Sequence, residues 1–157
     1  MTGWDGSKYR RIVVGVDGSP VAREALRWAA EEAELRGCAV EAVYGWQVST
    51  EPRPQGVEPG VAPPLDAYQR QAEERIAAVV AETLAPELAK RVTVRAVHRT
   101  PGRALIEEAE DADLLVLGSK GHGRLAAWLL GSIRDEAVQR APCSVVIVRP
   151  RPEAVPG

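Results

Sequence analysis

The residues best suited to chemistry lie in one glycine-rich stretch, GSKGHGRLAAWLLGS (118–132), which follows the apolar run DLLVL (113–117). Glycine in such a stretch either permits a tight turn or lets the backbone approach a ligand closely. Gly131 and Ser132 stand at the start of a segment with the pattern of a helix, 132–140. Because the N–H groups and the dipole of a helix start attract anions, the stretch predicts a phosphate chain gripped from two sides.

Two known phosphate-binding motifs fit this stretch only in part. Residues 118–125 have the glycine spacing of a Walker A loop, but Arg124 replaces the lysine and Leu125 replaces the hydroxyl that binds magnesium. GHGRLA (121–126) matches a dinucleotide-binding pattern, but it follows the fourth predicted strand, and the next strand lacks the acid that binds a ribose. The structural alternative remains open: the glycines serve only tight turns and a helix cap.

The elements that must position this stretch alternate along the chain. Apolar, β-branched runs predict strands at 12–16, 39–46, 92–97, 114–117 and 144–148. Helical spacing and cap residues predict helices from DGSP (17–20) to Gly37, and at 66–84, 101–111 and 132–140. This alternation predicts an α/β domain with a parallel sheet, whose ligands lie beyond the carboxyl ends of the strands. If the first and fourth strands are neighbours, DGSP and the glycine-rich stretch face one crevice; the sequence alone leaves the strand order open.

Composition limits the possible functions. The chain has 157 residues, a net charge of −2, 45% hydrophobic and 27% charged residues, which predicts one globular domain and does not favour nucleic acid as a partner. No apolar run reaches the roughly 20 residues that a membrane span needs, and we expect no signal peptide before the first strand. We expect a cytoplasmic domain over residues 10–150 with loose tails at 1–9 and 151–157, and with Cys38 and Cys143 as thiols.

The spacing of Gly118, Gly121, Gly131 and Ser132 resembles the nucleotide loop of the universal stress protein family. Four further segments resemble that family: IVVGVDGSP near the start, TPGRAL before the third predicted helix, ADLLVLGSKG, and APCSVVIVRP near the end. The resemblance covers residues 10–150 as a single copy. It implies an open five-stranded parallel sheet in the order 3-2-1-4-5, with helices on both faces, and a homodimer formed through the last strand.

In the branch of the family that binds ATP, the resemblance also implies which residues hold the nucleotide. At the nucleoside end they are Gly15, Val16 and Asp17, with Asp17 accepting a hydrogen bond from a ribose hydroxyl, and Gly45, whose backbone contacts adenine. At the phosphate end they are Leu117, Gly118, Lys120, Gly121, Gly131, Ser132 and Ile133. We further expect Trp46 near the adenine, and the proline-rich segment 49–64 to be either a lid or a tolerated insertion.

One position departs from the family pattern. The stretch GSIR has Arg134 where the family commonly has a serine or threonine hydroxyl that binds phosphate. Arg134 could donate to a phosphate, could fill the anion site by reaching Asp135 or Asp17, or could be a solvated arginine on the helix face. Lys120 likewise could reach a phosphate or remain a solvated loop lysine.

The sequence therefore predicts an ATP-binding regulatory protein of the stress response, with Mg²⁺ as the accompanying ion. We single out no catalytic or metal-ligating residue, since His122 has no partner at catalytic spacing and no base is placed to activate a water. The chain is accordingly expected not to be a dedicated enzyme. The alternatives are a nucleotide-free dimeric interaction module, with Arg134 blocking the phosphate site, and a slow ATPase. The regulatory partner remains unknown.

Overall fold

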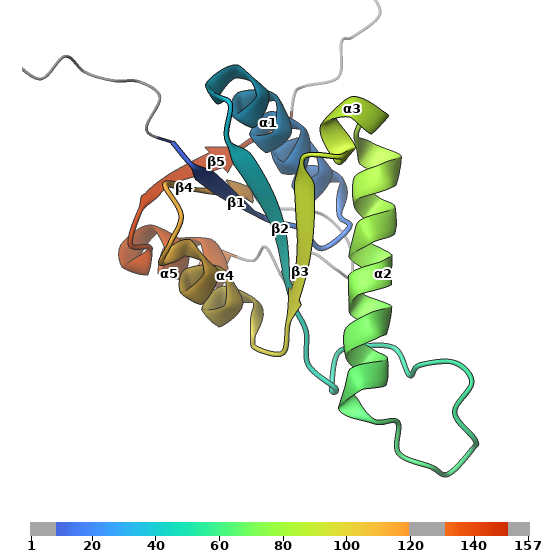
Figure 1. Ribbon diagram of the computed structural model, residues 1–157. Coiled ribbons are helices and arrows are strands. Elements are labelled where there is room, and N and C mark those ends of the chain that lie inside the picture. The colour runs from blue at the N-terminus through green and yellow to red at the C-terminus, as the bar shows by residue number, and fades with distance from the viewer. Residues whose placement is uncertain (1–8, 120–130, 151–157) are drawn as a thin grey trace, which may run out of the picture.

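Five parallel strands form one sheet in the order β3-β2-β1-β4-β5 in the computed structural model (Figure 1). The structure describes residues 9–119 and 131–150, and in the second range it describes side chains from Asp135 onward. In chain order the elements are β1 (Arg11–Gly15), α1 (Pro20–Arg36), β2 (Ala39–Gly45), α2 (Leu65–Thr83), α3 (Pro86–Ala89), β3 (Val92–Val97), α4 (Pro101–Ala109), β4 (Leu114–Gly118), α5 (Gly131–Arg140) and β5 (Ser144–Val148). The expected fold and strand order are confirmed.

The centre of the sheet is apolar on both faces because helices cover both. α1 and α2 pack on one face, and α4 and α5 pack on the other (Figure 1). In β1, Ile12 pairs with Val40 of β2 on one side and with Leu114 of β4 on the other. β4 is buried along its whole length, whereas β5, at the edge of the sheet, is only half-buried. Continuous apolar runs therefore predict these strands correctly, as is typical of parallel sheets.

Local chemistry explains where α1 begins and ends. The hydroxyl of Ser19 accepts a hydrogen bond from the Ala22 N–H at 3.3 Å, and Pro20 occupies the first helical turn. Gly37 ends the helix with φ 67°, in the left-handed region that favours glycine. Sequence reasoning predicts both ends of this helix because all of these interactions are local.

The predictions differ from the structure mainly after α2. Pro86 limits α2, as expected, but it also begins a short helix, α3, that the sequence analysis does not predict. Proline suits this position because the first N–H of a helix has no intrahelical partner. The other differences are one or two residues at element ends: β2 ends at Gly45, and α4 ends at Ala109.

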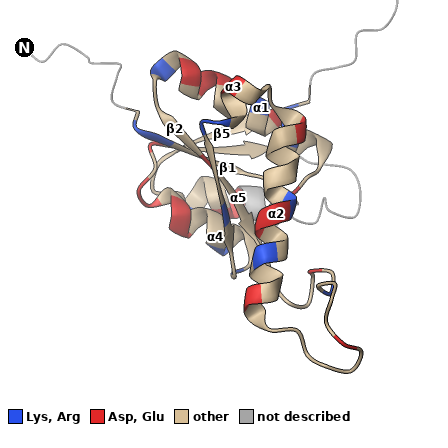
Figure 2. Cartoon of the chain, turned by 45° about the vertical axis from the view of Figure 1, so that its right-hand side comes forward, with Lys and Arg blue, Asp and Glu red and all other residues tan. Residues whose placement is uncertain are grey.

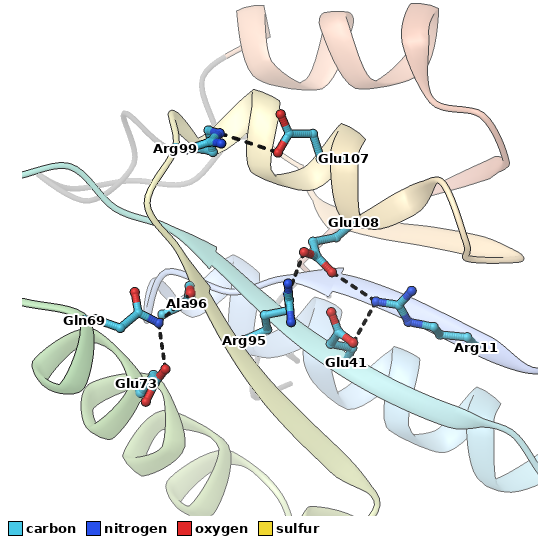
Figure 3. A network of polar contacts seen from close by, with 9 residues as sticks. All are labelled: Arg11, Glu41, Gln69, Glu73, Arg95, Ala96, Arg99, Glu107 and Glu108. Carbon is cyan, nitrogen blue, oxygen red and sulfur yellow. Dashed lines mark hydrogen bonds and ion pairs between the residues drawn. The ribbon is translucent and has the colours of Figure 1, made fainter. Parts of the chain in front are cut away.

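An ion-pair network fastens α4 to the sheet (Figure 3). The Arg11 Nη2 atom lies 2.7 Å from Glu41 Oε2 and 3.1 Å from Glu108 Oε2, and Arg95 Nε lies 2.6 Å from Glu108 Oε1. Burial acts to raise the pKa of Glu108, but the influence of the neighbouring Glu41 and the bonds from Arg95 and Arg11 outweigh burial and hold that pKa below its ordinary value. The network thus joins β1, β2 and β3 to one helix.

Candidate functional site

The two loops singled out in the sequence begin on the same side of the sheet, where the strands have their carboxyl ends. β1 and β4 are hydrogen-bonded neighbours, so the DGSP turn after β1 and the residues after Gly118 both follow the carboxyl ends of adjacent strands. The connection from β1 goes outward to β2, whereas β4 lies on the other side of β1. This is the point of strand-order reversal where open α/β sheets bind ligands. The expected adjacency is confirmed.

Asp17 is the most unusual side chain at this edge. It is only 3% exposed, and its Oδ1 atom accepts a hydrogen bond from the Ser19 N–H at 2.9 Å. Its Oδ2 atom is buried and has no hydrogen-bond partner among the residues that the structure describes. Burial raises the pKa of Asp17, while hydrogen bonds from Ser19 and the charge of Arg75 act to lower it. An unsatisfied buried carboxylate oxygen is costly, so this atom is poised for a donor.

The turn that carries Asp17 is held by backbone geometry. Gly18 has φ 87°, a conformation that side-chain-bearing residues rarely adopt. Just before the turn, the Val16 N–H donates to the Val43 carbonyl of β2 at 3.0 Å, which extends the pairing of the two strands. The side chain of Val16 is buried, and Gly15 is the last residue of β1, so both could offer a ligand only backbone groups.

The structure gives Gly118 a packing role. A β carbon at this position would lie 2.8 Å from the carbonyl oxygen and 3.0 Å from the carbonyl carbon of Val21, in the first turn of α1. The end of β4 and the start of α1 can approach this closely only because Gly118 has no side chain. This close strand–helix contact is neither a tight turn nor a helix cap, the two structural roles considered for these glycines, and the contact of Gly118 with a phosphate stays a prediction. The neighbouring Leu117 is buried in β4.

Gly45 also has a packing explanation. A β carbon there would lie 2.8 Å from the Pro101 Cα atom and 3.1 Å from the Ala104 Cβ atom, both in α4. The absence of a side chain thus brings the start of α4 against the end of β2. A contact between the Gly45 backbone and adenine remains a prediction.

Trp46 is part of the buried core near the carboxyl ends of the strands. Its ring stacks on Tyr68 of α2 with centroids 6.0 Å apart, and on His98 after β3 with centroids 4.2 Å apart. Trp46 is 2% exposed, and its Nε1–H donates to Gln69 Oε1 at 2.6 Å. The expected place beside adenine is therefore unsupported, because protein rings already stack on this indole.

Sequence reasoning missed three residues that meet close to this edge. The Arg75 Nη2 atom of α2 lies 2.9 Å from Glu51 Oε1, and its guanidinium lies 4.8 Å from the ring centre of Tyr44. The Tyr44 hydroxyl donates to the same Glu51 oxygen, and burial together with this hydrogen bond raises the pKa of Tyr44. No spacing in the sequence indicates this cluster, because its members come from β2, a loop and α2.

The proline-rich segment 49–64 supplies Glu51 to that cluster. The Gln71 side-chain amide of α2 donates to the Pro52 carbonyl at 2.8 Å, and Arg53 Nη2 donates to the carbonyls of Glu58 and Val61 at 3.0 and 2.6 Å. The rest of the segment runs outward past the start of α2 (Figures 1 and 2). In this conformation the segment is a loop that these hydrogen bonds hold in place. It extends away from the ends of β1 and β4 and is not a lid over them.

The expected phosphate end is described only in part. The described part of α5 starts at Gly131, and its first described turn contains Gly131, Ser132, Ile133 and Arg134. Because the residues immediately before Gly131 lie outside the described part of the chain, a helix start at these residues stays a prediction. Lys120 and Gly121 lie outside the described residues, as does His122. Their roles, and the role of the Arg134 side chain, stay predictions.

The model of the universal stress protein family matches residues 8–149. The chain belongs to the universal stress protein family. A universal stress protein of Mycolicibacterium smegmatis is 35% identical over 145 residues, which are 89% of this chain and 46% of that protein. One from Mycobacterium tuberculosis H37Rv is 33% identical over 146 residues, 90% of this chain and 46% of the relative. The chain thus spans about half the length of these curated relatives.

Solved structures of universal stress proteins share the fold. One in complex with cAMP is 26% identical, with a TM-score of 0.63 over 89% of this chain and 97% of that one. A universal stress protein from Archaeoglobus fulgidus in complex with dAMP is 25% identical, with a TM-score of 0.56 over 88% of this chain and 97% of that one. Separately, among the described residues no helix is both long and apolar enough to cross a membrane.

Proposed function

We propose that this universal stress protein binds ATP, accompanied by Mg²⁺, at the carboxyl ends of β1 and β4, and acts as a nucleotide-dependent regulator in the stress response. The observation that carries the proposal is the buried Asp17 Oδ2 atom, which has no partner among the described residues and stands where the strand order reverses. A ribose hydroxyl would donate to this oxygen and satisfy it. Asp17 is therefore suited to hold the nucleoside.

The remaining contacts of the nucleoside would come from the backbone. Gly15 and Val16 end β1 beside Asp17, and Gly45 ends the neighbouring strand β2. Their N–H and C=O groups would orient the sugar and the adenine edge. Backbone recognition is consistent with the burial of the Val16 side chain and with the tight packing around Gly45.

The phosphates would lie toward α5. The backbone N–H groups of Gly131, Ser132 and Ile133, in its first turn, would donate to phosphate oxygens, aided by the helix dipole. The segment from Leu117 to Gly121, which includes Gly118 and Lys120, would complete the grip from the other side. Arg134 would add a charge-assisted donor. Mg²⁺ would bind chiefly through the phosphates, as it does at many nucleotide sites.

Two neighbouring structures support an adenine nucleotide in particular. The universal stress proteins solved with cAMP and with dAMP cover nearly the whole of this chain. Both ligands contain adenine, ribose or deoxyribose, and phosphate. ATP shares those groups and adds a longer phosphate chain, which in the proposed site would lie between the glycines at 118–123 and Gly131.

We also propose a homodimer formed through β5, working in the cytoplasm. β5 pairs with β4 on one side, and Val145, Val146, Ile147 and Val148 are only half-buried. An edge strand with such residues favours pairing with another strand. Because the curated relatives are about twice as long as this chain, this assembly is proposed for the chain itself and not for them.

The test is calorimetric titration of Mg·ATP into protein stripped of nucleotide. We expect saturable binding of about one ATP per chain at micromolar Kd, which corresponds to about −8 kcal/mol. Asp17→Asn should weaken this binding at least tenfold, while Asp111→Asn, at an exposed position after α4, should leave it unchanged. Absence of heat up to millimolar ATP in the folded protein would contradict the proposal. If Arg134→Ser then created binding, the nucleotide-free interaction module would be the better account.

A further inference from the structure

The buried position of Asp17 creates an electrostatic problem for a residue that must accept hydrogen bonds from a ligand. With 3% of its surface exposed, its charged form loses most of its hydration. A protonated carboxyl group would present a hydroxyl donor in place of an acceptor lone pair. The Ser19 N–H stabilises the carboxylate through a hydrogen bond to Oδ1, but the Oδ2 atom accepts no hydrogen bond from the described residues. A nearby cation would keep the group ionised.

α2 places a cation beside the turn that carries Asp17. A β carbon added at Gly18 would lie 3.7 Å from the Val79 Cγ2 atom, so α2 passes directly over this turn. Arg75 is four residues earlier in α2 and therefore shares the face of Val79, about one helical turn away. The charge of Arg75 accordingly acts on the carboxyl group of Asp17 and lowers its pKa, against the larger effect of burial.

Two contacts hold the Arg75 side chain in this position, and a third interaction fixes one of its partners. Its Nη2 atom lies 2.9 Å from Glu51 Oε1, and its guanidinium stacks over the ring of Tyr44. Glu51, whose side chain is fully buried, is itself fixed by the Tyr44 hydroxyl. The arginine therefore cannot swing into solvent without leaving Glu51 as an unpaired buried charge. This also gives the proline-rich segment a role, because it delivers Glu51.

The other charged groups near Asp17 also have partners of their own. Arg23 of α1 donates to the Gly18 carbonyl at 3.2 Å and to Thr83 Oγ1 at 3.0 Å, and it pairs with Glu82 of α2. From β2, Tyr44 faces Glu51, and from the loop, Glu51 faces Arg75. The residues from 120 to 130, with Lys120 and His122, lie outside the described part of the chain. Arg23 is thus bound to the turn backbone, Thr83 and Glu82, whereas Arg75 lies on the face of α2 that covers the turn, and its charge acts to lower the pKa of Asp17.

We infer that Arg75, held by Glu51 and Tyr44, is a positioning residue of the nucleoside site that keeps Asp17 ionised and able to accept hydrogen bonds from the ligand. The inference rests on the proposed function, in which Asp17 binds the ribose. Arg75 itself is not assigned a contact with the nucleotide. Its effect should therefore appear in the titration of Asp17, with or without ligand, and in the pH dependence of ATP binding.

The decisive experiment is a ¹³C NMR titration of the Asp17 carboxyl carbon in the nucleotide-free protein. Arg75→Gln should raise the pKa of Asp17 by about 0.5 unit or more, and Arg75→Lys, which keeps the charge, should restore most of the wild-type value. Arg70→Gln, at an exposed position on the same helix, is the matched control and should cause no shift. If the glutamine variant does not fold, Arg75→Met, which keeps an unbranched apolar stem against Tyr44, replaces it.

Calorimetric titration of ATP across the same pH range gives the second readout. The pH below which affinity falls should move upward with the pKa of Asp17 in Arg75→Gln and return in Arg75→Lys. An unchanged Asp17 titration in a folded Arg75→Gln would overturn the inference, as would an affinity loss equal at every pH. Wild-type protein that binds no ATP at any pH would instead contradict the proposed function, and the NMR titration would still decide how Arg75 acts on Asp17.

Discussion

Gly118→Ala should destabilise the nucleotide-free protein, because the structure places Gly118 against the backbone of α1. The added β carbon would lie 2.8 Å from the Val21 carbonyl oxygen and 3.0 Å from both its carbonyl carbon and Cγ2. Carbon atoms in good contact are about 3.5–4.0 Å apart, so the β carbon would be too close by roughly half an ångström or more. Two of the three atoms are backbone in a helical turn capped by Ser19, and they cannot yield by a change of rotamer.

The expected cost is therefore that of overpacking, about 1–3 kcal/mol in the free energy of unfolding. For a domain of this size, each kcal/mol lowers Tm by roughly 2–4 °C. Urea denaturation and thermal unfolding without nucleotide measure the two quantities. Gly56→Ala is the control: its β carbon would meet nothing within 4 Å, at φ 83°. It should cost only the backbone strain of a left-handed residue, about 1–2 kcal/mol, without disturbing α1.

The outcome that would refute this reasoning is a Gly118→Ala protein as stable as wild type. If such a protein also lost ATP affinity, Gly118 would be a ligand-binding glycine, and the packing explanation would be wrong. If stability falls as expected while the folded variant keeps its affinity for ATP, Gly118 is required for the packing of β4 against α1 and not for binding the nucleotide.

Three further variants test other parts of the molecule. Glu108→Gln should lower the free energy of unfolding at pH 7 by about 1–3 kcal/mol, more than Glu110→Gln at an exposed position, because two arginines lose a charged partner. Since folding lowers the pKa of Glu108, its stabilisation is present above the pKa of an unfolded glutamate and is lost as the pH falls through the folded value. The difference in stability between Glu108→Gln and wild type, measured by urea denaturation, should therefore be smaller in acid than at pH 7. Gly131→Val should abolish ATP binding in calorimetry with an unchanged circular dichroism spectrum, and undiminished affinity would count against a two-sided phosphate grip. Arg134→Ser should weaken ATP binding several-fold if Arg134 donates to a phosphate, and tighter binding would show that Arg134 blocks the site.

The candidate site was predictable where its residues follow directly from strand ends. Asp17 comes immediately after an apolar run, and ligands of parallel sheets lie beyond such strand ends. Its proposed contact with a ribose was implied by the resemblance to the family. The glycines at 45 and 118 were predicted as ligand neighbours, yet the structure first explains them by contacts with Pro101 and Val21. A glycine in the sequence shows only that a side chain is absent there. Which neighbour occupies the space is decided by the packing of helices on the sheet.

The sequence by itself determined what depends on near neighbours in the chain. Apolar β-branched runs specify the strands, and Ser19, Pro20 and Gly37 specify the limits of α1, because these effects act within a few residues. Only the tertiary structure decided that Glu51 meets Arg75 across 24 residues and that both surround Tyr44. Such a cluster forms because three separate elements converge on one edge of the sheet, and burial then makes their charges depend on one another.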